Sequence, residues 1–204
     1  MTSASFDRDI DRCPWAGATG PNPDPLMVRY HDEEWGTPCH DDLELFERFA
    51  LESFQAGLSW STILRKRDGF RAAFAGFDPA VVAAFGPADV ERLMADASIV
   101  RNRAKIDATI GNAAGWLALA REHGTADAYL GAMVPGPPQT LPSDAVIGGI
   151  PATTAASDAL SADLRRRGFR FVGSTSVYAF MQSVGLVDDH LPGCFRYPGP
   201  TPRP

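Results

Sequence analysis

Two cysteines and two histidines from opposite ends of the chain have the residue types and spacing of a metal site. Cys13 and His31 lie near the N-terminus, and His190 and Cys194 lie near the C-terminus. The spacing of His190 and Cys194 can place both side chains on one face of a helical turn or across a tight loop. Zinc favours cysteine and histidine ligands, and four protein ligands would leave no open position for water. Such an ion would be structural and would join the two ends of the chain.

Other interpretations of these residues remain open on spacing alone. Cys39 and His40 are adjacent and could supply ligands instead. A histidine followed four residues later by a cysteine is a weak signal by itself. His40 and His123 also fit a solvated surface. The pattern therefore admits a zinc site without fixing its ligands.

A second group of residues combines aromatic rings with one carboxylate. Trp15, Tyr30 and Trp35 lie in the N-terminal segment, and Glu52 and Trp60 follow. Aromatic rings crowded near one carboxylate could line a binding pocket with a single polar group. The same residues fit a pattern of core tryptophans and one surface glutamate, because helical periodicity does not decide whether Glu52 is buried.

Basic side chains are concentrated in the middle of the chain. The net charge is −6, but residues 60–121 carry nine basic and six acidic side chains, whereas residues 1–59 carry four and twelve. A phosphate-binding surface, if the protein has one, would therefore lie in the middle third. Chance asymmetry on a solvated surface fits the composition as well.

The composition limits the class and the compartment of the protein. With 204 residues, 45% of them apolar and 22% charged, the chain resembles a soluble globular domain. No apolar run approaches the roughly 18 residues of a membrane span, and the polar, acidic start does not resemble a secretory signal. Three widely spaced cysteines favour a reducing compartment over a disulfide framework. We therefore expect a cytoplasmic protein without membrane contact.

Helical periodicity and capping residues predict an all-α fold without repeats or convincing strands. Residues 1–25 are expected to be irregular, and residues 135–142 to form a proline-rich connection. Six helices are predicted. The first begins at the cap Asp41, and the second begins after Asp78 and ends at Gly86-Pro87. The others cover Val90 to Ala97, about Asn102 to Arg121, a segment that ends at Gly168, and a segment from Ser174 or Thr175 to Gly185.

Six ordered motifs make these segments far more specific than their composition does. They are Cys13-x-Trp15, Tyr30-His31-Asp32-x-Glu34-Trp35-Gly36, Leu51-Glu52-x-x-Gln55-Ala56-Gly57-Leu58-Ser59-Trp60, Ser157-Asp158-Ala159-Leu160-Ser161, Gly168-Phe169-x-Phe171-Val172-Gly173 and Asp189-His190-x-x-Gly193-Cys194. Together they closely resemble the DNA-3-methyladenine glycosylase I family of the helix-hairpin-helix superfamily. The resemblance covers about residues 13–199. It implies a single all-α glycosylase domain of two closely packed helical lobes, with an irregular segment 1–12 and a tail 200–204.

The resemblance also assigns roles to individual residues. It implies one structural Zn²⁺ per chain, held by Cys13, His31, His190 and Cys194. It implies a pocket for the base in which Glu52 is the polar group that recognises the base and Tyr30 makes a second contact. The base would stack on Trp60, and Trp15 and Trp35 would line or brace the pocket.

A DNA-binding hairpin is implied for residues 96–105. The expected phosphate contacts are Ser98, Arg101, Arg103 and Lys105. Relatives commonly carry glycine where this chain has Ser98, and serine is the less favourable residue if that position requires a positive φ. The segment between Cys13 and His31 is expected to be longer than in the best-known relatives.

The implied function is hydrolysis of the N-glycosidic bond of N3-alkylated adenine in double-stranded DNA. The damaged nucleotide would be extruded into the aromatic pocket. No lysine stands out as a Schiff-base nucleophile, so a monofunctional enzyme that uses water is expected. We expect a monomer without an obligate protein partner, in the cytoplasm and at the nucleoid when acting.

Three other functions compete with this interpretation. The first is a non-catalytic, zinc-stabilised binder of alkylated DNA, against which the retention of Glu52, Tyr30 and Trp60 argues. The second is a zinc hydrolase, which four protein ligands oppose. The third is a purely structural zinc module, which would leave residues 52–60 unexplained.

Overall fold

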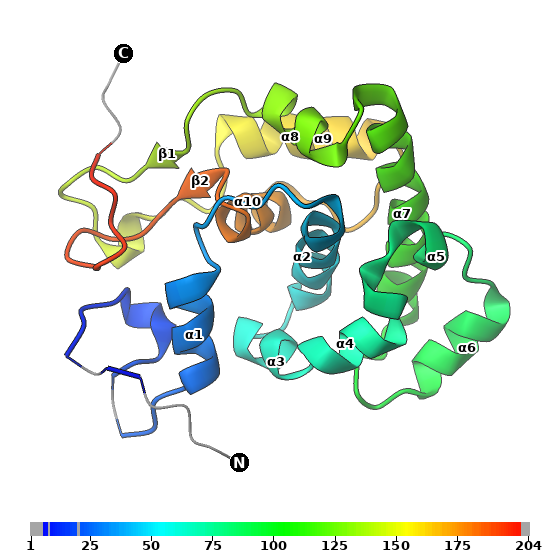
Figure 1. The fold of residues 1–204 in the computed structure, drawn as a ribbon, viewed down its shortest axis with the longest axis horizontal. Coiled ribbons are helices and arrows are strands. Elements are labelled where there is room, and N and C mark those ends of the chain that lie inside the picture. The colour runs from blue at the N-terminus through cyan, green and yellow to red at the C-terminus, as the bar shows by residue number, and fades with distance from the viewer. Residues whose placement is uncertain (1–5, 8, 20, 201–204) are drawn as a thin grey trace. The chain divides into compact units, whose positions relative to one another are not determined.

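The computed structural model describes residues 6, 7, 9–19 and 21–200, and most of them are helical (Figure 1). The α-helices are α1 (Pro25–Glu33), α2 (Asp42–Gln55), α3 (Trp60–Arg65), α4 (Arg67–Ala73), α5 (Pro79–Val82), α6 (Pro87–Ala95), α7 (Arg103–His123), α8 (Ala126–Met133), α9 (Ala155–Arg166) and α10 (Ser174–Ser183). Three 3₁₀ helices are η1 (Pro14–Ala16), η2 (Ala75–Phe77) and η3 (Ile147–Gly149). None of the helices in the described part combines the length and the apolar content of a membrane span. The predicted all-α class is confirmed.

Two short strands are an exception to the prediction that the chain has none. β1 (Gln139–Thr140) and β2 (Val187–Asp188) pair in parallel, with Gln139 opposite Val187. Strands of two residues are too short to show the alternating pattern by which a strand is recognised in a sequence. β1 lies within the connection that was expected to be irregular.

The described chain divides into two compact units, each made of segments far apart in the sequence. The terminal unit contains Met1–Pro38, Pro137–Ala152 and Met181–Pro204. The central unit contains Cys39–Gly136 and Thr153–Phe180. The prediction of a single domain over residues 13–199 stays a prediction. Within the expected segments 1–12 and 200–204, residues 1–5, 8 and 201–204 lie outside the described residues.

The core of the central unit forms around α2, which is buried on all sides. Every side chain over residues 45–54 is buried. Phe46 and Phe49 pack against Trp116 of α7, with ring centroids 5.6 and 5.2 Å away. Burying a large apolar side chain contributes about 1.5–3 kcal/mol. Residues on every face of α2 are therefore held in fixed positions, including the polar ones.

Capping side chains begin two of the central helices where the sequence predicts. Asp41 accepts hydrogen bonds from the backbone at the start of α2, and Asp78 does the same for α5. One predicted boundary is wrong. Gly86-Pro87 does not end the helix after Asp78, because α5 ends at Val82 and Pro87 begins α6. Proline suits the first position of a helix, where its missing N–H would have no partner.

The terminal unit brings the two ends of the chain together. The backbone N–H of Phe195 donates to the carbonyl of Asp11 at 2.9 Å. The Arg196 guanidinium donates to the carbonyl of Asp32 at 2.6 Å and to the hydroxyl of Thr37 at 2.9 Å. These bonds attach the C-terminal segment to α1 and to the segment that follows it.

Candidate functional site

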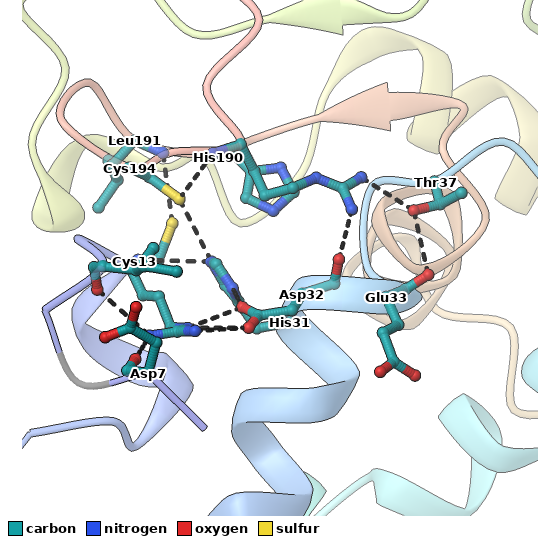
Figure 2. Close-up of polar contacts among 12 residues, drawn as sticks. Asp7, Cys13, His31, Asp32, Glu33, Thr37, His190, Leu191 and Cys194 are labelled. Carbon is teal, nitrogen blue, oxygen red and sulfur yellow. Dashed lines mark hydrogen bonds and ion pairs between the residues drawn. The ribbon is translucent and has the colours of Figure 1, made fainter. Parts of the chain in front are cut away.

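A buried cluster of two cysteines and one histidine lies in the terminal unit (Figure 2). The ligand atoms of Cys13, His31 and Cys194 all lie within 4.8 Å of one another. Cys194 Sγ is 3.4 Å from His31 Nε2, and the Leu191 backbone N–H donates to Cys13 Sγ at 3.4 Å. This cluster could hold a metal ion. It joins the N- and C-terminal segments, as predicted.

His190 lies beside this cluster, but it is not one of the three residues whose ligand atoms all lie within 4.8 Å of one another. Its ring centroid is 4.9 Å from that of His31. Its Nδ1 is 2.6 Å from Asp188 Oδ1, and its buried Nε2 has no hydrogen-bond partner among the described residues. A buried ring nitrogen without a partner is costly unless something binds it. His190 therefore places a ring nitrogen without a partner among the described residues beside the cluster, and its role as the fourth ligand stays a prediction.

A carboxylate orients each of the two histidines. Asp32 Oδ1 is 2.8 Å from His31 Nδ1, and Arg12 forms an ion pair with the same carboxylate at 2.8 Å. Asp188 holds His190 in the same way. Metal-binding histidines usually make such a bond through the second ring nitrogen, which fixes the ring and strengthens it as a ligand.

The two thiols of the cluster differ in how readily they ionise. The hydrogen bond with Cys13 is the largest cause that lowers the pKa of Cys194 to about 4, and the hydrogen bond with His31 lowers it further. The same bond with Cys194, and burial, raise the pKa of the Cys13 thiol. One thiolate is therefore ready to bind a cation, and a bound cation would favour loss of the second proton.

The N-terminal aromatic residues surround the histidines of this cluster. The Trp15 ring centroid is 5.2 Å from that of His31, and the Trp35 centroid is 4.7 Å from that of His190. Tyr30 is buried, with its ring 6.3 Å from Trp15. The structure thus gives Trp15 and Trp35 a bracing role at the cluster. The base-pocket roles implied for these three residues stay predictions.

Gly36 is needed where α1 leads to the next segment. Its φ is +71°, and a Cβ there would stand only 2.9 Å from Cε1 of His190. Any other residue would be strained and would displace the imidazole. This explains why a glycine follows Trp35 in the motif.

Glu52 lines a small cavity of the central unit. The cavity has a volume of ≈ 260 Å³ and is lined by Glu52, Gln55, Ala56, Gly57, Leu58, Thr175, Ser176 and Ala179. Glu52 is 5% exposed, and its Oε2 has no hydrogen-bond partner among the described residues. Burial raises its pKa to about 8. This buried carboxyl group is therefore neutral at pH 7, and a cation beside it would favour its ionised form.

Several residues that line this cavity had no predicted role. Gln55 and Leu58 belong to a motif in which only Glu52 and Trp60 were assigned roles. Thr175 and Ser176 lie on the first turn of α10, and Thr175 was considered only as a helix cap. Their position beside Glu52 depends on how α10 packs, which no local sequence signal reports.

Trp60 begins α3 and is half-buried, but it is not among the residues that line the cavity. The hydroxyl of Ser59 caps this helix by accepting from the backbone N–H of Thr62 at 3.2 Å. The expectation that Trp60 forms a stacking wall stays a prediction.

The predicted hairpin lies between α6 and α7. Asp96 accepts from the backbone N–H of Ser98 at 2.8 Å, and the Lys66 ammonium donates to the carbonyl of Ala97 at 2.8 Å. Ser98 does not have a positive φ, so serine is not strained there. A Cβ on Gly69 would stand 2.8 Å from the Ser98 carbonyl oxygen, so this glycine lets α4 approach the hairpin.

The three cations expected to contact phosphates differ in availability. Arg101 is exposed and forms no ion pair among the described residues. Arg103 forms an exposed ion pair with Glu91 at 2.7 Å. Lys105 is only 6% exposed, and its ammonium donates to the carbonyls of Phe54 at 2.9 Å and Ala56 at 2.6 Å. This placement contradicts a phosphate contact by Lys105.

Lys105 instead stabilises the C-terminal end of α2, where backbone carbonyls have no helical partners. We expect Lys105→Met to lower the free energy of unfolding by about 1–3 kcal/mol, because two carbonyls lose a charged donor. Chemical denaturation checks this, with the exposed Arg121→Met as the control. An unfolding free energy equal to that of the control would contradict this structural role.

Comparison with solved structures identifies the class of the protein. The chain is similar to a crystal structure of 3-methyladenine DNA glycosylase I, with a TM-score of 0.85 and 48% identity, over 92% of this chain and 100% of that one. It is also similar to a variant of 3-methyladenine DNA glycosylase I in complex with 3-methyladenine, with a TM-score of 0.83 and 36% identity, over 88% and 96% of the two chains. The protein therefore has the predicted fold of a helical DNA glycosylase.

Sequence comparison gives the family. Residues 20–197 match the family model described as methyladenine glycosylase. DNA-3-methyladenine glycosylase 1 of Escherichia coli (strain K12) is 47% identical over 193 residues, which cover 95% of this chain and 100% of the relative. The chain belongs to the methyladenine glycosylase family, as the resemblance of its motifs implies.

Proposed function

We propose that this protein hydrolyses the N-glycosidic bond of 3-methyladenine in double-stranded DNA. The observation that carries the proposal is Glu52, a buried carboxyl group in a cavity, with one oxygen that has no hydrogen-bond partner in the described part of the chain. Buried polar groups without partners are rare outside sites that bind something. The family of the chain, and a related structure in complex with 3-methyladenine, support 3-methyladenine as the base that the cavity takes.

The charge of the lesion explains how a single carboxyl group selects it. An adenine alkylated at N3 is cationic while it is attached to the sugar, and it leaves as a neutral base. The cation lowers the pKa of Glu52, so the carboxylate forms against the exocyclic amine of the lesion. An undamaged adenine lacks the charge and gains less from this contact. Stacking on Trp60 would add about 1–2 kcal/mol for a cationic ring.

The nucleotide must leave the duplex before the pocket can hold its base. Arg101 and the backbone of residues 96–102 would hold phosphates during this step. These contacts carry no sequence information, so the enzyme would scan DNA without sequence preference. Binding would weaken as the salt concentration rises.

The attacking group is water rather than a lysine. The chain contains two lysines, Lys66 and Lys105. Both ammonium groups donate to backbone carbonyls within the central unit. Neither is free to form a Schiff base, which supports a monofunctional glycosylase.

We infer that Cys13, His31, His190 and Cys194 hold one structural zinc ion. Two sulfurs, a ring nitrogen beside them and the unpartnered Nε2 of His190 match the ligand types of closed tetrahedral zinc sites. With all positions filled by protein, the ion would stabilise the terminal unit and take no part in catalysis.

The physiological setting follows from the substrate. The partner would be duplex DNA containing alkylated bases, and the protein would act in the cytoplasm, at the nucleoid. One chain bears both the cavity and the hairpin, so a monomer suffices for one lesion and no protein partner is required.

Release of the free base tests the proposed function. Methylated duplex DNA is incubated with the protein, and liberated purines are identified by chromatography. We expect 3-methyladenine as the product. Binding of the methylated duplex without any released base would show instead a non-catalytic binder.

A further inference from the structure

Residues 167–173 of the central unit link α9 to α10 (Figure 1). This link leads directly to Thr175 and Ser176, which line the Glu52 cavity. Phe171 in this link has a φ of 56°, which is unusual for a bulky residue, and its side chain is 37% exposed. Backbone strain of this kind persists only where surrounding contacts impose it, and it is concentrated at functional sites.

Three helices hold the backbone of this link. Asn112 of α7 accepts from the Arg170 N–H at 2.9 Å and donates to its carbonyl at 3.0 Å. Ser161 of α9 donates to the Val172 carbonyl at 2.6 Å, and Ser53 of α2 donates to the Phe171 carbonyl at 3.4 Å. The link is therefore a fixed platform, although it contains an exposed aromatic ring.

Two exposed arginines, one just before the link and one within it, form no ion pair among the described residues. They are Arg165, near the end of α9, and Arg170, within the link. Their neighbours differ, because Arg166 and Arg167 pair with Asp163. Arg165 Nη2 lies 3.7 Å from the position of a Cβ on Gly173, so its guanidinium extends along the link toward the start of α10.

We propose that Arg165 and Arg170 form a second phosphate-binding surface, beside the Glu52 cavity and separate from the hairpin. This inference rests on the proposed function, because its ligand is the backbone of the DNA that carries the lesion. Arginine suits this role because its planar guanidinium can donate two hydrogen bonds to one phosphate. The exposed Phe171 ring, next to Arg170 in the chain, offers an apolar contact to a sugar or an unstacked base.

The spacing along α7 separates this surface from the hairpin. Asn112 holds the link ten residues after Asn102, where the hairpin ends, which corresponds to about 15 Å along a helix. Phosphates of one strand follow each other at much shorter intervals. The two surfaces are therefore far enough apart to contact different phosphates.

The salt dependence of DNA binding tests this proposal. Dissociation constants for an undamaged duplex are measured between 50 and 200 mM salt for the unaltered protein, Arg165→Gln/Arg170→Gln and the control Arg121→Gln. Each lost phosphate contact lowers the slope of log K against log salt by about 0.9, so we expect the double variant to lose about 1.8. Arg121 is exposed at the far end of α7 and forms no ion pair with any residue that the structure describes, so its variant should keep the full slope.

A charge-conserving variant separates binding from a structural role. We expect Arg165→Lys/Arg170→Lys to keep the slope, because a lysine still neutralises a phosphate. A slope for the glutamine variant equal to that of Arg121→Gln would overturn the proposal, as would loss of slope in the lysine variant. If the proposed function itself is wrong, the unaltered protein releases no 3-methyladenine, whereas failure of this inference leaves that release intact.

Discussion

Replacing Glu52 by glutamine should lower the rate of 3-methyladenine excision at least about 100-fold and leave affinity for undamaged duplex within about twofold. Glutamine keeps the size of the side chain and its hydrogen-bonding oxygen but cannot become an anion. Losing one preorganised electrostatic contact to the reacting group commonly costs 10²–10³ in rate. The measurement is single-turnover release of the base, beside equilibrium binding of an undamaged duplex.

The folding of this variant provides a control. Because burial raises the pKa of Glu52 to about 8, the folded protein keeps a proton that the unfolded chain releases from about pH 4.5 upward. The wild-type free energy of unfolding should therefore fall, relative to Glu52→Gln, by up to about 1.4 kcal/mol per pH unit across this window, and level off above pH 8. Equal losses of excision and of undamaged-duplex binding would make Glu52 a structural residue instead.

Removing the proposed zinc ion should destabilise the terminal unit rather than only abolish the activity. We expect Cys194→Ser to lower bound zinc from one ion per chain to none and to lower the free energy of unfolding by at least about 3 kcal/mol. Structural zinc contributes its binding free energy to folding, which reaches about 10–16 kcal/mol in small zinc-binding peptides. Elemental analysis and chemical denaturation measure both effects.

Cys39→Ser is the matched control for this experiment. Cys39 is a free, partly exposed cysteine of the central unit, outside the Cys13 cluster. Its replacement should change neither the zinc content nor the stability of the terminal unit. A zinc-free Cys194→Ser protein that is inactive but fully stable would contradict a structural ion and favour a catalytic one.

Helix starts marked by a capping residue before a clear apolar stripe could be predicted from the sequence. α2, α7 and α10 are examples. α1, α3, α4 and α8 could not, although side chains also cap some of them. Asp24 caps α1 within a segment rich in proline and glycine, and Thr125 caps α8, a short helix with Gly131 inside it. Helices this short form because of tertiary packing rather than local propensity.

The candidate sites were predictable to different extents for physical reasons. Residue type and spacing indicated a Cys/His cluster, because few residues can bind zinc. The burial of Glu52 could not be predicted, because helical periodicity does not place it on the apolar stripe of α2, whereas in the structure every side chain over residues 45–54 is buried. Lys105 was misassigned because a positive charge in a basic segment does not reveal that its ammonium binds carbonyls at the end of another helix.

The pH dependence of kcat/KM for 3-methyladenine excision tests most directly whether Glu52 recognises the lesion by charge. This ratio reports the protonation of the free enzyme, and the lesion in DNA is cationic throughout the range. For the wild-type protein, kcat/KM should rise about tenfold per pH unit and level off near pH 8, whereas the Glu52→Gln profile should be flat. A wild-type ratio that falls between pH 6 and 8, or the same profile in both proteins, would contradict a carboxylate that binds the cationic base.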